Sequence, residues 1–128
     1  MSIRIFLVED HPVMRGIYVD LLDCEPDFEL CGITESAEAC LDVLPDTHCN
    51  ILVTDLSLPG MDGIALIKQV RADRPGFPAI VVSAHEASKY EDLAREAGAG
   101  AYVGKADLAR DLAPTIRRVA AGPQTAEG

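Results

Sequence analysis

Four short, nearly continuous apolar runs constrain the fold of this chain more than any other feature of its sequence. They cover residues 3–8, 51–53, 79–82 and 101–103, and each is rich in β-branched or aromatic residues. Strands that helices cover on both faces have this composition. A fifth candidate strand, residues 28–33, alternates apolar and polar residues at its start, so one of its faces is expected to meet water. We therefore place it at an edge of the sheet.

Segments of helical periodicity separate these runs. In the first segment, one face carries the apolar residues Val13, Ile17, Leu21 and Leu22. Pro12 suits the first turn of this helix, and Pro26 lies beyond its end. The other helices are predicted near residues 36–44, 64–70, 89–97 and 108–121. Five strands that alternate with five helices predict an α/β fold, with a doubly wound parallel sheet between two helical layers.

Two residues set expectations for where helices end or bend. Gly98 follows the fourth helical segment and is placed to end it in the left-handed conformation. Pro114 lies inside the last segment, where it donates no backbone hydrogen bond and its ring crowds the preceding turn. We expect the regular helix either to begin near Pro114 or to kink there.

Length and charge limit the classes of function. The 128 residues suffice for one domain, and 21 acidic against 11 basic residues give a net charge of −10, which disfavours a free-standing nucleic-acid binder. No apolar stretch approaches the roughly 18 residues that cross a bilayer, and the amino terminus does not resemble a signal peptide. We expect a cytoplasmic protein with no membrane partner.

The four cysteines give no sign of a metal site. They form no CxxC pair, and no histidine is spaced to complete a zinc site with Cys24, Cys31, Cys40 and Cys49. A short secreted chain could use four cysteines for two disulfides, but nothing else in the sequence points outside the cell. We expect all four to be buried thiols.

Polar residues follow the carboxyl end of each buried run. Glu9 and Asp10 follow the first run, Asp55 lies just after the second, Ser83 follows the third, and Lys105 lies two residues beyond the fourth. In a sheet of order 2-1-3-4-5, ligands bind beyond these ends, between strands 1 and 3. Three carboxylates in one place repel one another unless a cation compensates, and Mg²⁺ or Mn²⁺ prefers such oxygen ligands.

A simpler interpretation is that these residues cap helices or meet solvent. Asp10 could cap the helix that Pro12 begins, Ser83 could cap the next helix, and Lys105 could be a solvated residue at a strand end. That interpretation does not explain why acids, a hydroxyl and a lysine share one rim. Together they supply the nucleophile, the hydroxyl donor and the positive charge that phosphoryl transfer requires.

Four segments, in order, carry a family resemblance. Residues 8–12 (Val-Glu-Asp-His-Pro), 55–63 (Asp-Leu-Ser-Leu-Pro-Gly-Met-Asp-Gly), 82–84 (Val-Ser-Ala) and 102–105 (Tyr-Val-Gly-Lys) resemble the successive signatures of a response-regulator receiver domain of two-component systems. The resemblance covers about residues 3–122 and implies the flavodoxin-like (CheY-like) fold. The opening of the first helix, residues 10–16, further resembles the NarL/LuxR class, whose members usually carry a C-terminal helix-turn-helix DNA-binding domain.

The resemblance also implies a domain organisation. Residues 1–121 would form the receiver domain, and residues 122–128 would begin an interdomain linker or form a disordered tail. We expect the sequence to be part of a longer transcription regulator rather than a natural single-domain protein. Its partners would be a sensor histidine kinase, a second copy of the chain as a candidate homodimer, and DNA only through the missing domain.

By the same resemblance, Asp55 would accept a phosphoryl group from a phosphohistidine. Glu9, Asp10, Asp55 and the backbone carbonyl of Ser57 would hold Mg²⁺. Lys105 and Ser83 would bind phosphoryl oxygens. Movement of Ser83 and Tyr102 would switch the face built from the fourth helix, the fifth strand and the fifth helix, so Tyr102 is expected at least partly outward before phosphorylation. Two further residues vary in the family and are candidates for setting the phosphoryl lifetime: Ser57 and His85.

The sequence departs from the family pattern after the lysine. Many receivers have proline there, whereas this chain has Ala106, so we expect a trans Lys105–Ala106 peptide bond. By the resemblance, the chain is not an enzyme acting on a separate substrate, although it would assist its own phosphorylation and dephosphorylation.

Three other functions stay open from the residues alone. A phosphohydrolase could use the same strand-end aspartate, but such enzymes typically need a second aspartate two residues later, where Ser57 lies. An FMN carrier shares the architecture, but three carboxylates would repel the cofactor phosphate. A binding module that is never phosphorylated would not need the acceptor, the acids, the hydroxyl and the lysine together.

Overall fold

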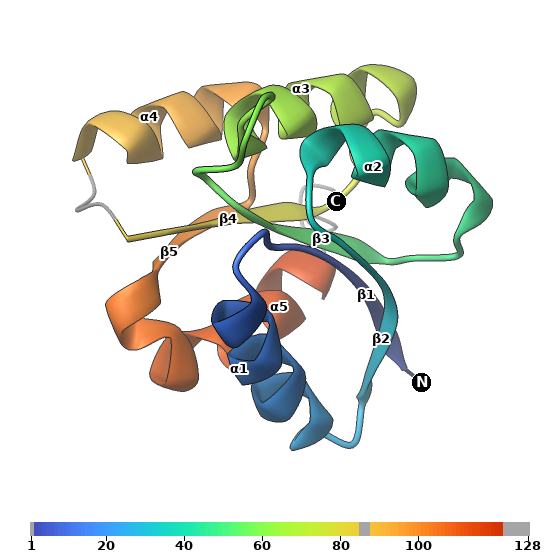
Figure 1. The fold of residues 1–128 in the computed structure, drawn as a ribbon, viewed down its shortest axis with the longest axis vertical. Coiled ribbons are helices and arrows are strands. Elements are labelled where there is room, and N and C mark those ends of the chain that lie inside the picture. Colours follow the sequence, from blue (N-terminus) through green and yellow to red (C-terminus); the bar gives the residue numbers. More distant parts are fainter. Residues whose placement is uncertain (1, 85–87, 122–128) are drawn as a thin grey trace.

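The computed structural model describes residues 2–84 and 88–121, and its centre is a single sheet of five parallel strands (Figure 1). The strands are β1 (Ile3–Val8), β2 (Phe28–Thr34), β3 (Ile51–Asp55), β4 (Ala79–Ser83) and β5 (Ala101–Gly104). They lie in the order β2-β1-β3-β4-β5. This order confirms the prediction, and β2 is one of the two edge strands, as expected.

Helices cover both faces of this sheet (Figure 1). Helices α1 (Pro12–Asp23) and α5 (Leu108–Ala121) lie on one face, and α2 (Ala37–Val43), α3 (Gly63–Asp73) and α4 (Ser88–Ala97) lie on the other. Side chains of β1 alternate between the two cores: Ile5 and Leu7 pack on the α1/α5 side, and Phe6 and Val8 pack on the α2/α3/α4 side. The doubly wound α/β fold is therefore confirmed.

A capping serine begins α2, and a glycine follows the end of α4. The Ser36 hydroxyl accepts a 3.1 Å hydrogen bond from the Ala39 amide at the start of α2. A one-turn 3₁₀ helix, η1 (Leu44–Asp46), follows α2. Gly98, with φ +105°, follows α4 in the left-handed conformation, as predicted.

Helix α1 presents to the core only part of the face that the apolar pattern predicted. Val13 is 65% exposed and Ile17 is 42% exposed, whereas Tyr18 is fully buried and Leu22 nearly so. The residues that face the sheet are four apart, Tyr18 and Leu22, and Met14 extends this stripe. The predicted face was half right: Leu22 is buried and Leu21 packs partly buried against the core as predicted, whereas Val13 and Ile17 do not. The phenol ring of Tyr18, despite its polar end, fills the α1/α5 core instead.

Helix α5 continues through Pro114. It covers Leu108–Ala121, with a one-turn 3₁₀ helix, η2 (Lys105–Asp107), directly before it. Of the two alternatives expected at Pro114, a regular helix that begins there was wrong, and the predicted extent of residues 108–121 is confirmed. Pro114 lies on the exposed side, while the core side is formed by Leu108, Leu112, Ile116 and Val119. The Lys105–Ala106 peptide bond is trans, as expected.

The cysteines are less buried than the sequence suggested. All four are free thiols, but only Cys40 is buried, while Cys24 is exposed and Cys31 and Cys49 are partly exposed. Cys24 follows α1, Cys31 lies within the edge strand β2, and Cys49 precedes β3. At such positions burial depends on the packing of neighbouring segments rather than on the hydrophobicity of the residue.

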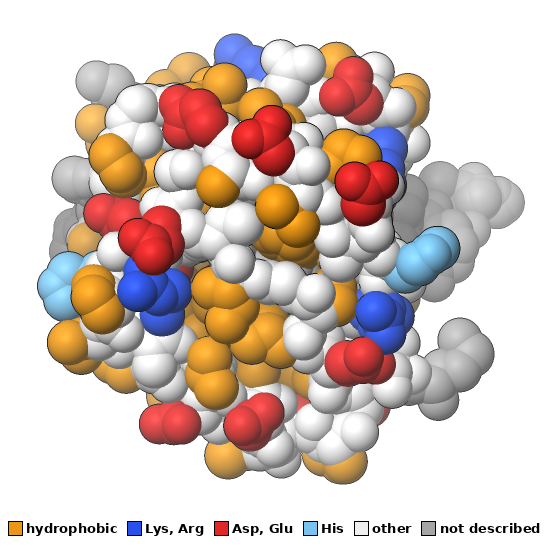
Figure 2. All heavy atoms as spheres, turned by 45° about the vertical axis from the view of Figure 1, so that its right-hand side comes forward, with side chains coloured by type: hydrophobic (Ala, Val, Ile, Leu, Met, Phe, Trp, Pro, Cys, Tyr) orange, Lys and Arg blue, Asp and Glu red, His pale blue; other side chains and the backbone are white. Residues whose placement is uncertain are grey.

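The surface is mixed in charge. Figure 2 shows acidic side chains spread over one face of the molecule, with basic groups between them and apolar side chains exposed at intervals. Within the described ranges, no helix combines the length and the apolar character that crossing a bilayer would demand.

Candidate acidic functional site

Three carboxylates converge at the point where the strand order reverses. Glu9 follows β1 and is fully buried, Asp55 ends β3 and is 4% exposed, and Asp10 is exposed beside them. One carboxylate oxygen of each residue lies within 4.8 Å of the others. This is the only cluster of three or more potential metal-ligating side chains in the described part of the chain. The β1/β3 boundary therefore forms an acidic pocket at the carboxyl ends of the strands.

Among the described residues, Lys105 is the only one whose ammonium group forms an ion pair with these acids. Its Nζ lies 3.2 Å from Asp55 Oδ2 and 3.4 Å from Glu9 Oε1. The contact with Asp55 is a hydrogen bond, whereas Glu9 Oε1 has no hydrogen-bond partner in the described structure. One lysine thus faces two buried carboxylates, and its charge offsets only part of their repulsion.

The pocket makes both buried carboxylates weaker acids. Burial raises the pKa of Glu9, and the neighbouring Asp55 carboxylate raises it further, while the His11 amide and Lys105 act against this shift. Burial also raises the pKa of Asp55, the Lys105 ammonium lowers it, and Asp10 adds a smaller upward contribution. The negative charges are costly in the isolated protein, so the pocket favours an incoming cation.

Backbone contacts hold the acidic loop in place. The His11 amide donates a 3.2 Å hydrogen bond to Glu9 Oε2. Arg15 Nη1 lies 3.1 Å from the carbonyl oxygens of both Glu9 and Asp10. The residue at the start of α1 is His11, without a side-chain cap, so the interpretation of Asp10 as the cap is wrong. The role of Arg15 was not predicted, although it lies within the motif of residues 10–16.

The loop after Asp55 is held equally closely. A Cβ at Gly63 would lie 2.2 Å from the backbone oxygen of Asp55, so only glycine fits there. Asp62 caps α3 by accepting a 2.8 Å hydrogen bond from the Ala65 amide. Glu38 of α2 accepts a 3.0 Å hydrogen bond from the Met61 amide. Residues of α2 and α3 therefore set the path of the chain that leaves Asp55.

The remaining predicted site residues lie at different distances from the acids. Ser83 is buried at the end of β4, one position beyond Val82, which pairs with Asp55. Ser57 is exposed two residues after Asp55. Tyr102 lies on β5 and packs from a partly exposed position against the α2/α3/α4 core, consistent with the expected outward placement. His85 lies outside the described residues.

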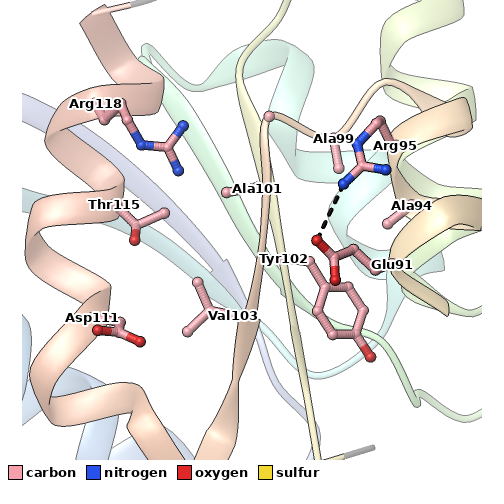
Figure 3. Close-up of a pocket in the computed structure, with 11 residues that line it drawn as sticks. Glu91, Ala94, Arg95, Ala99, Ala101, Tyr102, Val103, Asp111, Thr115 and Arg118 are labelled. Carbon is pink, nitrogen blue, oxygen red and sulfur yellow. Dashed lines mark hydrogen bonds and ion pairs between the residues drawn. The ribbon is translucent and has the colours of Figure 1, made fainter. Parts of the chain in front are cut away.

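A separate hollow of about 310 Å³ lies over β5, between α4 and α5. Figure 3 shows Glu91 and Arg95 of α4 on one side, Asp111, Thr115 and Arg118 of α5 on the other, and Tyr102 between them. Glu91 and Arg95 form an ion pair of 3.1 Å across one helical turn. This hollow shares Tyr102 with the predicted switch, but it holds none of the three clustered carboxylates.

Comparison with known families decides the class of the protein. The profile of the response regulator receiver domain matches residues 5–117. The chain belongs to the response regulator receiver domain family. Receiver domains bind Mg²⁺ in an acidic pocket, and the clustered oxygens of Glu9, Asp10 and Asp55 fit this donor chemistry.

Curated relatives of this receiver include transcription regulators. It is 29% identical over 120 residues to the DNA-binding transcriptional activator DevR/DosR of Mycobacterium tuberculosis, covering 94% of this chain and 55% of that protein. It is 32% identical over 119 residues to the transcriptional regulatory protein CssR of Bacillus subtilis, covering 93% and 52%. The receiver therefore spans about half the length of these relatives.

A solved structure confirms the class of receiver. A two-component response regulator of the LuxR family from Aurantimonas sp. SI85-9A1 superposes with a TM-score of 0.90 at 30% identity, covering 94% of this chain and 86% of that one. The response regulator domain of Thermotoga maritima CheB superposes with a TM-score of 0.86 at 22% identity, covering 94% and 98%, which supports the fold alone. The resemblance to NarL/LuxR receivers is thus confirmed.

Proposed function

We propose that this receiver accepts a phosphoryl group on Asp55 from a phosphohistidine of a sensor histidine kinase. The observation that carries the proposal is the arrangement around Asp55: a nearly buried carboxylate, an ammonium 3.2 Å away, and two more carboxylates within 4.8 Å. A capping or structural aspartate needs neither the lysine nor the neighbouring acids. A nucleophile for phosphorus needs the lysine, because positive charge must balance the approaching phosphoryl group, and the acids would hold the divalent cation that adds to this charge.

The chemical step follows from the residues at this rim. A carboxylate oxygen of Asp55 attacks phosphorus, the P–N bond breaks, and the histidine of the kinase leaves with the bonding electron pair. The Lys105 ammonium already lies against Asp55 Oδ2, so it is placed to pair with a phosphoryl oxygen. Ser83, at the end of the adjacent strand, would donate a hydrogen bond to another oxygen.

The residues proposed to hold the metal are Glu9, Asp10, Asp55 and the backbone carbonyl of Ser57. Mg²⁺ would supply positive charge for the phosphoryl oxygens, and Mn²⁺ has the same preference for oxygen ligands. Glu9 Oε1 has the Lys105 ammonium 3.4 Å away but no hydrogen bond, and the pKa of Glu9 is raised; both support this assignment, since they indicate a carboxylate with too little positive charge around it.

The output is proposed to be a change of conformation rather than turnover of a separate substrate. Ser83 moves toward the phosphoryl group, Tyr102 follows, and the α4–β5–α5 face changes. The exposed Ser57, and His85, are candidates for setting the phosphoryl lifetime. A cytoplasmic regulator with this receiver in residues 1–121, a linker from residue 122 and a C-terminal helix-turn-helix domain would then control transcription, with homodimerisation as a candidate step.

The test is acetyl phosphate with Mg²⁺, followed by intact mass measurement. We expect wild type to gain one phosphoryl group and Asp55→Asn to gain none. Asp42→Asn changes an exposed aspartate on α2 in the same way and should be modified like wild type. An unmodified wild type, or equal modification of Asp55→Asn, would contradict the proposal. Steady release of phosphate from a simple phosphate ester would instead indicate a phosphohydrolase.

A further inference from the structure

Two thiols from different elements meet beside the amino-terminal half of β1, whereas the acidic cluster lies at its carboxyl end. The Sγ of Cys31, in β2, lies 2.8 Å from the Sγ of Cys49, which precedes β3 by two residues. This separation exceeds the about 2.0 Å of a disulfide bond by roughly 0.8 Å. A small movement of either side chain would therefore bring the sulfur atoms to bonding distance.

The backbone positions both thiols. Ile5 of β1 pairs with Leu30 and the next residue, Phe6, pairs with Gly32, so Cys31 is the extra residue of a bulge in β2. Its Sγ also contacts the Ile5 carbonyl oxygen at 3.3 Å. The segment of Cys49 is held beside β1, because the Asn50 amide donates to the Arg4 carbonyl at 2.7 Å and the Arg4 amide donates to Asn50 Oδ1 at 2.7 Å.

A metal ion does not explain this pair. Two sulfur atoms bound to one tetrahedral zinc at about 2.3 Å each would stand about 3.7 Å apart. The sulfur atoms here are closer than that. Moreover, the only group of three or more potential ligating side chains in the described ranges is the acidic cluster, so these thiols lack further ligands.

We propose that Cys31 and Cys49 form a site of reversible oxidation, which a hydroperoxide converts into an intramolecular disulfide. Both residues are partly exposed, so a small uncharged peroxide can reach them. Cys24 is exposed and Cys40 is buried, and the only thiol–thiol contact recorded among the described residues joins Cys31 to Cys49. The site is independent of phosphorylation on Asp55.

The two thiols have different roles in this reaction. Burial raises the pKa of Cys49 to about 12, and the hydrogen bond with Cys31 adds to this shift, so Cys49 stays protonated. Cys31 loses its proton and attacks one peroxide oxygen, the O–O bond breaks, and the departing hydroxide takes up that proton, which gives a Cys31 sulfenic acid and one water from hydrogen peroxide. The Cys49 sulfur then attacks the Cys31 sulfur, loses its proton and displaces hydroxide as a second water. Two thiols are oxidised and one peroxide is reduced, and a dithiol reductant reverses the product.

The experiment treats the reduced chain with hydrogen peroxide, denatures it, alkylates the free thiols and measures the intact mass. No lysine or arginine lies between Arg15 and Lys68, so trypsin would leave all four cysteines on one peptide. A protease that cleaves at Asp and Glu separates them. We expect a monomer with two alkylated thiols, Cys24 and Cys40, and a linked pair of peptides that contain Cys31 and Cys49.

Variants distinguish this site from general oxidation. Cys24→Ser and Asp55→Asn should form the disulfide like wild type, whereas Cys31→Ser and Cys49→Ser should not. A sulfenic acid probe should label Cys31 in Cys49→Ser, and labelling of Cys49 in Cys31→Ser instead would overturn the order of attack. Two kinds of product would overturn the site itself: a disulfide through Cys24, or a linkage between chains. Full alkylation of Cys31 and Cys49 when Cys24 is already oxidised would overturn it as well.

Discussion

The buried carboxylate of Glu9 illustrates how a single side chain can lower the stability of the fold that positions it. Its folded pKa lies above its ordinary value, first because of burial and then because of Asp55. The folded state therefore binds this proton more tightly than the unfolded state does. Stability from this group is present at low pH and is lost as pH rises through the folded pKa.

Replacing Glu9 with glutamine tests this direction of the pH dependence of stability. Without divalent cations, we expect Glu9→Gln to have a higher free energy of unfolding than wild type at neutral pH, because the buried charge is removed. The difference should shrink as the pH falls, since wild-type Glu9 is then protonated. Urea unfolding of both proteins across the acidic to neutral range measures this difference. A difference that grows on acidification would contradict the assignment.

Tyr18 carries a second buried oxygen without a recorded partner. Its ring is fully buried on the α1/α5 side, and its hydroxyl has no hydrogen-bond partner in the described structure. Burial, together with the nearby Glu9 and Asp55 charges, raises the pKa of Tyr18. An unsatisfied buried hydroxyl costs about 1–3 kcal/mol, while the ring itself contributes to the core.

We therefore expect Tyr18→Phe to be as stable as wild type or more stable by about 1 kcal/mol. Tyr18→Ala, which also removes the ring, should lose about 3–5 kcal/mol because it leaves a cavity. Chemical denaturation of the three proteins gives the comparison. A loss above about 1 kcal/mol in Tyr18→Phe would indicate that the hydroxyl makes a stabilising hydrogen bond.

At the scale of elements, the start of α3 is packed directly against the end of β3. A Cβ at Gly63 would come within 2.2 Å of the Asp55 carbonyl oxygen, and the Gly63 amide donates to the Leu56 carbonyl at 2.9 Å. α3 can therefore lie this close to Asp55 only because Gly63 has no side chain.

Gly63→Ala should separate α3 from β3. We expect a loss of about 1–3 kcal/mol in the free energy of unfolding from overpacking, together with slower phosphorylation by acetyl phosphate. Gly16→Ala is the matched control: no atom lies within 4 Å of an added Cβ there, and alanine favours the α1 helix, so stability should rise by about 0.4–1 kcal/mol. Equal effects of the two substitutions would contradict the close approach at Gly63.

Ion pairs also join elements that lie far apart in the sequence. Arg117 of α5 forms ion pairs with Glu25 at 2.6 Å and with Asp27 at 2.7 Å, and its guanidinium lies 4.8 Å from the centre of the Phe28 ring. These contacts connect the last helix to the turn before the edge strand β2. They hold the part of α5 that follows Pro114 in place on the α1 side of the sheet.

For the whole molecule, the net charge of −10 and the acidic pocket act in the same direction: cations stabilise the folded state. We expect Mg²⁺ to raise the melting temperature at neutral pH, with a gain of about 2.7 kcal/mol at 100 times the dissociation constant. Protons compete for the same carboxylates, so the gain should diminish at acidic pH.

Thermal unfolding with and without Mg²⁺ measures this effect, and a sodium chloride series at equal ionic strength separates it from general screening. Glu9→Gln and Asp55→Asn should lose most of the magnesium-specific gain, whereas Asp42→Asn should keep it. An equal gain in all four proteins would place the bound ion elsewhere.

Much of this protein was predictable from the sequence alone. The alternation of apolar runs with helical segments determined the α/β class, since each run is too short to be anything but a strand and too apolar to be exposed. The chain positions of Glu9, Asp55, Ser83 and Lys105 after those runs determined that they share one rim, because parallel strands end at the same edge.

Tertiary structure decided what periodicity cannot resolve. A helical pattern does not say which of two apolar stripes faces the sheet, so Tyr18 rather than Val13 and Ile17 fills the core. Spacing along the chain does not say that Cys31 and Cys49 meet, nor how closely Lys105 approaches Asp55, 50 residues away. Such contacts depend on how strands, bulges and crossovers bring remote segments together, which is a property of the folded chain and not of local composition.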